Sequence, residues 1–225
     1  MTRGAFIVIE GLDRSGKSTQ AARLLERIEA ASKSVQLLKF PDRSTPIGQL
    51  IDSYLRSRSD MDDHTIHLLF SANRWEISSK IKSLLESGTT IICDRYAFSG
   101  IAFSASKALI EESSPPSSSP LTYEWCRAPD VSLPAPDLTL FLDISPEQAA
   151  RQREGYGEER YEKLEMQARV REVFARIGKE IGAEGWVTID AGRSREEVEK
   201  DIWEKVSPLV EGVNGPVNAL WNDLL

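Results

Sequence analysis

Short, uninterrupted apolar segments alternate with amphipathic segments along the whole chain. An apolar run without polar alternation is typical of a strand that is buried on both faces, as in a parallel sheet. Runs of this kind occur at Ala5–Glu10, Val35–Phe40, Thr90–Asp94, Leu138–Asp143 and Trp186–Asp190. We predict that each of them forms a strand.

Amphipathic patterns fill the intervals between these predicted strands. Apolar residues recur at spacings of three and four over 21–28 and 47–54, which places them on one face of a helix. Thr45 is the predicted N-cap of the second of these helices, and Pro46 suits its first helical position. Longer helical patterns run over 62–86, 162–182 and 195–210, the last of which is interrupted late by Pro208.

The strand–helix alternation continues without a change in composition, which predicts one α/β domain over residues 1–225, built on a parallel sheet. One stretch, about 109–120, departs from the pattern. Within it, Ser113 to Pro120 reads S-S-P-P-S-S-S-P. Serine and proline bury little apolar surface, so we expect a surface loop, which is either a tolerated insertion or a site of regulatory phosphorylation.

Composition and charge narrow the classes of partner. The 225 residues are 40% hydrophobic and 28% charged with a net charge of −7, which argues against a nucleic-acid coat protein or a polybasic membrane binder. Cys93 and Cys126 are the only cysteines, which excludes a disulfide framework and a Cys-only zinc site. Because no secretory signal or long apolar run is visible, we expect a cytoplasmic protein, with the nucleus as a second compartment.

The turn after the first predicted strand carries a phosphate-binding motif. Residues 11–18 read G-L-D-R-S-G-K-S and fit G-x-x-x-x-G-K-[ST] between a predicted strand and a predicted helix. Glycines let the backbone curl so that its N–H groups point at phosphate oxygens, and the helix N-terminus adds positive potential. Lys17 suits the β- and γ-phosphates and Ser18 suits Mg²⁺, so the motif predicts a bound nucleoside triphosphate.

Charged residues also follow other predicted strands. The third strand ends in Asp94, a position for an acid near Mg²⁺, and Arg95 comes next, at the crevice where ligands bind. Arg14 lies inside the phosphate-binding turn and Arg43 follows the second strand. Several arginines at one edge of the sheet, in an acidic protein, predict a site for two phosphate-bearing substrates.

A glycine-rich stretch after the fourth strand is flanked by further arginines. Arg151, Arg153 and Arg160 bracket Gly155 and Gly157. We predict a lid over about 151–161 that closes on phosphates and excludes water. Which lid arginine contacts phosphate stays open.

Six segments of the chain occur in an order that is specific to one family. They are F-I-V-I-E-G-L-D-R-S-G-K-S-T-Q at 6–20, F-P-D-R-S-T-P-I-G at 40–48, L-L-F-S-A-N-R-W-E at 68–76, D-R-Y-A-F-S-G at 94–100, P-D-L-T-L-F-L-D at 136–143 and E-R-Y-E at 159–162. Together they resemble the thymidylate kinases, a family of nucleoside monophosphate kinases. The resemblance implies a P-loop fold, with a five-stranded parallel sheet wrapped by helices and a short lid. It also implies ATP-dependent phosphorylation of dTMP to dTDP for dTTP biosynthesis, with Mg²⁺ and as a homodimer.

The same resemblance implies roles for individual residues. The implied catalytic residues are Arg14, Lys17, Asp94 and Arg95, and the implied metal ligands are Ser18 and Asp94. The implied ATP-binding residues are Gly11, Asp13, Arg14, Ser15, Gly16, Lys17, Ser18, Thr19 and Arg153, the last of them under the adenine. The implied dTMP-binding residues are Asp13, Phe40, Arg43, Phe70, Arg74, Arg95, Ser99, Gly100, Phe103, Tyr161 and Gln167.

Within the implied dTMP site, Arg43 and Arg95 would clamp the phosphate, and Asp13 would hold the deoxyribose 3′-hydroxyl. Phe70 would stack on thymine, and Arg74 would hydrogen-bond a thymine carbonyl. Phe103 would lie where a ribose 2′-hydroxyl clashes, and Tyr161 and Gln167 would be contacts from the lid side. Without the resemblance, Phe70 and Arg74 share one helix face and read as core packing plus a surface charge.

Other functions stay open on the residues alone. A kinase for another nucleotide would share the phosphate-binding turn, because the motifs define phosphate sites better than base sites. A GTPase switch would need an N-K-x-D segment, and no asparagine here precedes a lysine. A non-catalytic scaffold would be expected to lack Lys17 or Arg14. A phosphate acceptor is already ionised at neutral pH and needs no general base, which fits two histidines, His64 and His67, that lie away from every motif.

Overall fold

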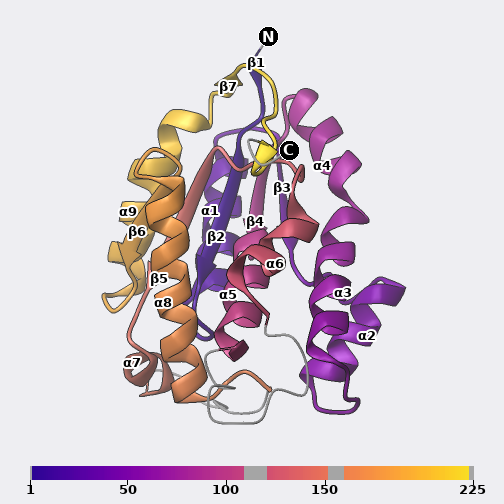
Figure 1. Cartoon of the computed structure of the whole chain (residues 1–225). Coiled ribbons are helices and arrows are strands. Elements are labelled where there is room, and N and C mark those ends of the chain that lie inside the picture. Colours follow the sequence, from indigo (N-terminus) through magenta and orange to yellow (C-terminus); the bar gives the residue numbers. More distant parts are fainter. Residues whose placement is uncertain (1, 109–120, 152–159, 223–225) are drawn as a thin grey trace.

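A five-stranded parallel sheet forms the centre of the molecule (Figure 1). The computed structural model describes residues 2–108, 121–151 and 160–222. The strands lie in the order β3 (Val35–Lys39), β4 (Thr90–Asp94), β2 (Phe6–Gly11), β5 (Leu138–Asp143) and β6 (Trp186–Asp190). All four pairings are parallel, so the carboxyl ends of the strands meet at one edge, as the apolar runs predicted.

Helices cover both faces of the sheet, because successive strand residues point into two separate cores. In β2, Phe6 and Val8 belong to one core, and Ile7 and Ile9 belong to the other. The first core is covered by α5 (Ala97–Ala108) and α8 (Leu164–Ile181), with α2 (Pro46–Leu55), α3 (Asp63–Trp75) and α4 (Ser78–Glu86) beside them (Figure 1). The second core is covered by α1 (Lys17–Ala30) and α9 (Arg195–Val206).

Shorter elements complete the described parts of the chain. These are α6 (Tyr123–Arg127), α7 (Pro146–Arg151) and the 3-10 turns η2 (Ala128–Asp130) and η3 (Ser207–Leu209). Across the described ranges, no helix combines the length and the apolar character that a membrane crossing needs. The Ser/Pro-rich stretch 109–120 and most of the predicted lid, 152–159, lie outside the described residues.

The pattern over 62–86 is not one helix, and that prediction is wrong. Helix α3 ends at Trp75 and α4 begins at Ser78, because Ile77 between them has a non-helical backbone (φ −118°, ψ 7°). The side chains of Thr45 and Asn73 each donate a hydrogen bond of 2.9 Å to the Glu76 carboxylate at this break. The break lets α3 pack against α2 and α5, while α4 packs against β4.

The start of α2 follows its sequence signals. Thr45 is the N-cap, and its hydroxyl accepts a hydrogen bond from the backbone N–H of Gly48 at 3.0 Å, while Pro46 is the first helical residue. Gly48 is required by a close approach, since a Cβ there would overlap the carbonyl of Asp42. The loop that carries Arg43 is thereby held tightly on the first turn of α2.

A buried ion pair ties the two ends of the chain to the sheet. β1 (Thr2–Arg3) pairs antiparallel with β7 (Val213–Asn214). The guanidinium of Arg3 donates two hydrogen bonds of 2.7 Å to the carboxylate of Asp137, just before β5. Asp137 also accepts from the backbone N–H of Phe6 at 2.8 Å, so it fixes the amino ends of β2 and β5. This pair lies at the edge of the sheet opposite the strand carboxyl ends.

His67 of α3 is a core histidine. It is fully buried; its Nε2 lies 2.8 Å from the carbonyl oxygen of Cys126, and its Nδ1 lies 2.8 Å from the Ser104 hydroxyl. A carbonyl only accepts, so the neutral ring carries its proton on Nε2 and accepts from Ser104. Burial, reinforced by the charge of Arg74, lowers the pKa of His67 to about 4.

This depressed pKa predicts an acid-sensitive core. The stability that depends on neutral His67 is present above the ordinary histidine pKa of 6.5 and is lost as the pH falls towards about 4. Between about pH 7 and about pH 4.5, the wild type should lose about 2 kcal/mol more free energy of unfolding than His67→Gln does. Urea unfolding at both pH values measures this difference. The control is His64→Gln, which alters a histidine with a 26% exposed side chain and should show the same loss of stability as the wild type. If the stability of His67→Gln and of the wild type depended on pH in the same way, the assignment would be contradicted.

Candidate functional site

The carboxyl ends of the central strands open into a cavity of about 360 Å³. The phosphate-binding turn between β2 and α1 forms one wall. Residues from the ends of β3 and β4, from α2, α3 and α5, and from the segment just before α8 form the rest. The lining includes most of the residues predicted from the sequence: Asp13, Arg14, Gly16, Lys17, Ser18, Phe40, Arg43, Phe70, Arg74, Asp94, Arg95, Ser99, Gly100, Phe103 and Tyr161.

The phosphate-binding turn has the curled backbone that its motif predicted. Gly16 ends the turn in the left-handed region (φ 98°), where a glycine is favoured, and Arg14 also has a positive φ of 66°. Lys17 is the first residue of α1, and its ammonium donates a hydrogen bond of 2.5 Å to the carbonyl of Leu12. Burial, with the charge of Arg95 as a second cause, lowers the pKa of Lys17 to about 7. In the described part of the chain, the hydrogen bonds of this ammonium go to the Leu12 carbonyl and, at 3.4 Å, to the Ser15 hydroxyl, and phosphate oxygens would be stronger, anionic partners.

Ser18 and Asp94, the two predicted metal ligands, lie next to each other in the structure. The Ser18 hydroxyl donates a hydrogen bond of 2.5 Å to Oδ2 of Asp94, whose other oxygen, Oδ1, is buried without a hydrogen-bond partner. A buried carboxylate oxygen without a partner beside a hydroxyl fits a hard divalent cation such as Mg²⁺. In the described parts of the chain, no three His, Cys, Asp or Glu side chains gather as a metal cluster.

Lys39 is a site residue that the sequence reasoning missed. It is the last residue of β3, and its ammonium lies 3.2 Å from the Ser18 hydroxyl and 3.5 Å from Asp94. Its side chain is 62% exposed, so it lies at the mouth of the cavity. Its position at the end of a strand could have identified it from the sequence, because the other charged residues of the site lie at the same edge of the sheet.

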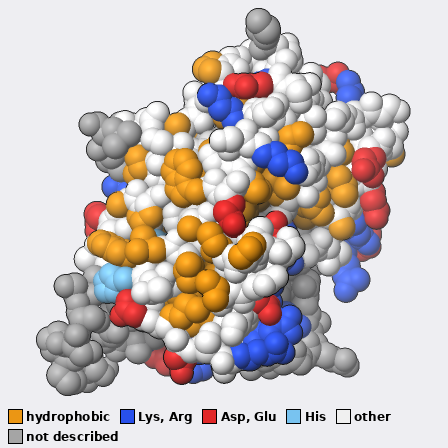
Figure 2. Space-filling model, turned by 90° about the vertical axis from the view of Figure 1, so that its right-hand side faces the viewer, with side chains coloured by type: hydrophobic (Ala, Val, Ile, Leu, Met, Phe, Trp, Pro, Cys, Tyr) orange, Lys and Arg blue, Asp and Glu red, His pale blue; other side chains and the backbone are white. Residues whose placement is uncertain are grey.

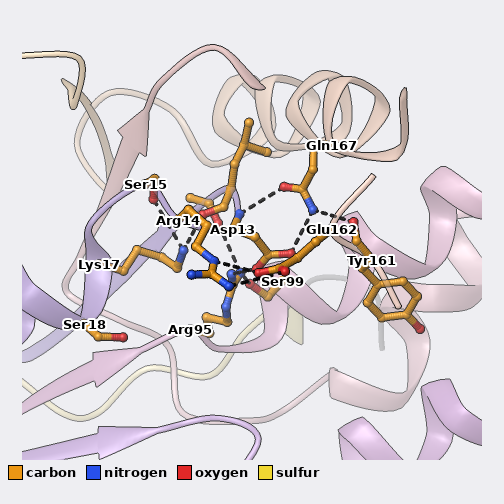
Figure 3. A network of polar contacts seen from close by, with 12 residues as sticks. Asp13, Arg14, Ser15, Lys17, Ser18, Arg95, Ser99, Tyr161, Glu162 and Gln167 are labelled. Carbon is orange, nitrogen blue, oxygen red and sulfur yellow. Dashed lines mark hydrogen bonds and ion pairs between the residues drawn. The ribbon is translucent and has the colours of Figure 1, made fainter. Parts of the chain in front are cut away.

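Arg95 and Asp13 lie at the centre of a polar network (Figure 3). The Arg95 guanidinium forms an ion pair with Asp13 and donates hydrogen bonds of 3.1 Å to the Ser99 hydroxyl and to the carbonyl of Gly11. Gln167 of α8 binds Asp13 through both ends of its side-chain amide. The amide oxygen accepts from the backbone N–H of Asp13 at 3.0 Å, and the amide nitrogen donates to the Asp13 carboxylate at 2.8 Å. Gln167 thus joins the site through Asp13 rather than by lining the cavity.

Glu10 supports this network from inside the sheet and was missed by the sequence reasoning. Its carboxylate is fully buried and accepts hydrogen bonds from the backbone N–H groups of Tyr96 and Ser99 at 2.9 and 3.0 Å. It also accepts from the Ser99 hydroxyl at 2.5 Å. Burial raises the pKa of Glu10. The sequence held a sign of this role, because an acid within an otherwise apolar strand is buried, and burying a carboxylate destabilises the fold unless hydrogen bonds satisfy it.

Arg14 and Glu162 form an ion pair across the cavity. The Nε of Arg14 lies 2.8 Å from the Glu162 carboxylate, which is largely buried (Figure 3). Glu162 was not among the predicted site residues, although it closes the E-R-Y-E segment. Next to it, the ring of Tyr161 lies 5.6 Å from that of Phe103, and the Arg95 guanidinium lies 5.2 Å from the Phe103 ring centroid.

Phe70 and Arg74 lie on one face of α3, as their spacing predicted, and both line the cavity. Arg74 is not a surface charge, because it is 2% exposed and forms a two-bond ion pair with the buried Asp130. Arg43, from the loop after β3, also lines the cavity and donates to Asp52 at 2.7 Å.

Four of the predicted residues that the structure describes do not line the cavity: Gly11, Ser15, Thr19 and Gln167. Gly11, Ser15 and Thr19 lie in or next to the turn, where they shape its backbone or begin α1. Arg153 lies outside the described residues, so its predicted contact with adenine stays a prediction. Arg160, at the end of the predicted lid, turns away from the cavity and donates to the carboxylate of Asp60 at 2.6 Å.

Comparisons with known proteins agree with this geometry. The family model for thymidylate kinase matches residues 9–202. The chain is 49% identical to the thymidylate kinase of Arabidopsis thaliana, over 98% of this chain and 78% of that relative. It is 46% identical to the thymidylate kinase of Homo sapiens, over 97% of this chain and 98% of that relative. The solved structure of thymidylate kinase from Candida albicans superposes with a TM-score of 0.87 at 40% identity, covering 97% of this chain and 99% of that one.

The predicted family and fold are therefore confirmed. The matched region contains the phosphate-binding turn, the strand end at Asp94 and both residues of the pair Phe70 and Arg74. The chain belongs to the thymidylate kinase family and catalyses the ATP-dependent phosphorylation of dTMP to dTDP.

Proposed function

We propose that ATP binds at the phosphate-binding turn and dTMP at the α3 side of the same cavity, so that their phosphates meet at Arg14 and Arg95. The observation that carries this proposal is one continuous cavity lined both by Lys17 of the turn and by Phe70 and Arg74 of α3. Arg14 and Arg95 lie between Lys17 and Tyr161 in Figure 3, where the transferring phosphoryl group would pass.

The turn would bind the triphosphate through backbone N–H groups and the positive end of α1. The ammonium of Lys17 would leave the carbonyl of Leu12 for the β- and γ-phosphate oxygens, which are the stronger partners. Its pKa of about 7 would rise on binding, because two anions favour the charged form. ATP binding would then protonate Lys17 wherever the free enzyme holds it neutral.

Ser18 and Asp94 would hold Mg²⁺ through their side-chain oxygens. When bound, the ion would supply positive charge that offsets the negative charge of the phosphates. The partnerless Oδ1 of Asp94 supports this role, since an ion would satisfy an otherwise isolated buried acceptor. Lys39 beside Asp94 would hold the carboxylate in place while the metal is absent.

For dTMP, Arg95 and Arg43 would bind the phosphate. Arg95 is held in advance by Ser99 and Asp13, so little side-chain freedom would be lost on binding. Asp13, clasped by Gln167, would accept from the 3′-hydroxyl of the sugar. Phe103, against Tyr161, would fill the space that a ribose 2′-hydroxyl needs.

Phosphoryl transfer would need positioning and charge neutralisation rather than a base. The second pKa of a phosphate monoester is about 6, so the acceptor oxygen is already ionised at neutral pH. The guanidinium of Arg14 would exchange its bond to Glu162 for the transferring phosphoryl group, where the negative charge is greatest in the transition state. Glu162 would hold Arg14 over the cavity until both substrates are bound.

We also propose that the chain forms a homodimer through α2 and α3. Leu50 of α2 and Leu68 and Trp75 of α3 are large apolar side chains that are 41–49% exposed. Figure 2 shows hydrophobic side chains gathered on the face that includes these helices. Large apolar side chains exposed together on one face are typical of a protein interface. The cytoplasm, with the nucleus as a second compartment, remains the prediction for location.

Replacing Leu68 by aspartate tests the dimer. A charge at the centre of an apolar interface would remain buried without a partner, so Leu68→Asp should be monomeric, whereas wild type should have twice the monomer mass of 25.1 kDa. Light scattering after size exclusion measures both masses. Leu164→Asp, which alters a leucine of α8 that is 46% exposed, is the control and should remain dimeric. A monomeric wild type would rule out the proposed interface.

Lys17→Ala tests the triphosphate site. Losing an ammonium that contacts the transferring group should lower kcat by at least about 10³-fold, while the fold is retained. Steady-state ADP production from ATP and dTMP measures the effect. Lys82→Ala removes a lysine that is 61% exposed on α4, and this control should keep kcat within about twofold. More than a tenth of wild-type activity in Lys17→Ala would contradict the role.

Arg95→Ala tests which substrate lies at the α5 side. Because Arg95 is proposed to bind the dTMP phosphate, the variant should raise KM for dTMP by at least about tenfold and change KM for ATP much less. Arg176→Ala, an exposed arginine of α8 paired with Glu124, is the control. The opposite pattern, with ATP binding weakened more, would mean that the two phosphate positions are assigned the wrong way round.

A further inference from the structure

Asp130 is a buried carboxylate that belongs to none of the groups assigned above. It is the last residue of η2, it has no exposed surface, and it does not line the cavity. Its two oxygens accept from Nε and Nη2 of Arg74 at 3.1 and 2.6 Å. Arg74 is itself only 2% exposed, and its guanidinium lies at the cavity wall. Asp130 therefore touches the site only through Arg74.

Asp130 is itself fixed by further contacts. The hydroxyl of Ser71, one turn before Arg74 on α3, donates to Oδ1 of Asp130 at 2.8 Å. Ser71 also lies 3.1 Å from the carbonyl of Pro129, and the indole of Trp75 donates to the same carbonyl at 2.8 Å. One face of α3 therefore carries Arg74 and also binds the segment that contains its counter-ion, Asp130.

The other side of Arg74 is closed by α5. A Cβ added to Gly100 would lie 2.7 Å from Nη2 and 3.1 Å from Nη1 of Arg74, so the guanidinium packs directly on the glycine backbone. With Asp130 on one side and Gly100 on another, the guanidinium plane has one orientation. A two-bond pair of this kind fixes direction as well as position.

We propose that Asp130 is a positioning residue that determines base selectivity, because it holds Arg74 as a fixed hydrogen-bond donor towards the pyrimidine edge. The inference rests on the proposed function, in which Arg74 faces the base of dTMP. It adds that selectivity depends on the rigidity of Arg74, which Asp130 and Ser71 supply, and not only on the presence of an arginine.

The selectivity follows from the donors of the guanidinium. Arginine has N–H donors and no acceptor at any accessible pH. Thymine presents a carbonyl acceptor at the ring position where cytosine presents an amino donor. A fixed Arg74 would bond the first and oppose N–H to N–H with the second. A mobile arginine would swing away and let water bridge to cytosine, so discrimination would be lost.

The test compares dTMP and dCMP as acceptors with ATP held at saturation. Wild type should prefer dTMP by on the order of 10³-fold in kcat/KM, since a site built for one hydrogen-bonding pattern rejects the reverse pattern. Asp130→Asn keeps the size of the side chain but can accept only one of the two bonds from Arg74. Its preference for dTMP should fall by at least about tenfold, mainly through a higher KM for dTMP, with KM for ATP unchanged.

Asp137→Asn is the matched control. Asp137 forms the same two-bond pair, with Arg3, at the opposite edge of the sheet. Both variants should lower the melting temperature, and only Asp130→Asn should change the ratio of dTMP to dCMP turnover. Should Asp130→Asn fail to fold, Ser71→Ala removes one bond to the Asp130 carboxylate, and the ratio should still fall several-fold.

The outcomes separate this inference from the proposed function. An unchanged dTMP preference in both Asp130→Asn and Ser71→Ala, or an equal loss in Asp137→Asn, would overturn the role of Asp130. A wild type that uses dCMP as well as dTMP would overturn it too, while leaving dTMP turnover intact. If Arg74→Lys, which keeps a donor but loses the two-bond geometry, leaves the preference unchanged, then Arg74 does not face the base and the proposed dTMP site itself fails.

Discussion

The parallel register between β2 and β4 is the constraint on which the site depends. Ile9 pairs with Asp94, so β2 passes into the phosphate-binding turn beside the residues that end β4. This alignment brings Ser18 to Asp94 and Asp13 to Arg95, although each pair is separated by more than seventy residues of sequence. A shift of one residue would exchange the faces of every side chain in the strand and separate these pairs.

Each arginine that lines the described cavity is held by a carboxylate, which explains how an acidic protein offers a cationic cavity. The pairs are Arg14–Glu162, Arg43–Asp52, Arg74–Asp130 and Arg95–Asp13. The carboxylates reduce the repulsion between neighbouring guanidinium groups and fix their directions before substrate arrives. Such preorganisation is more useful for phosphoryl transfer than free positive charge, because the reaction requires correct placement above all. The net charge of −7 and the local function are therefore compatible.

The site is also built into the interior of the protein. Glu10 lies in the central strand and accepts hydrogen bonds from Tyr96, which follows Arg95, and from Ser99 in the first turn of α5. A buried acid of this kind is costly for stability and is compensated only by complete hydrogen bonding. Asp130 is a second buried acid, and its ion pair with Arg74 fixes the direction of the guanidinium rather than stabilising the fold. Both acids show that the residues which orient the site extend a layer behind those that line it.

The sequence by itself determined the strands, the phosphate-binding turn, the N-cap at Thr45 and the family, because these depend on local spacing and on short motifs. It also placed Phe70 and Arg74 on one helix face. Only the tertiary structure decided that the pattern over 62–86 breaks at Ile77, because a hydrophobic period does not reveal that its two halves pack against different neighbours. Glu10, Lys39, Asp130 and Glu162 became site residues for the same reason: a charge acquires its role from a partner distant in sequence, and chain folding alone brings the two together.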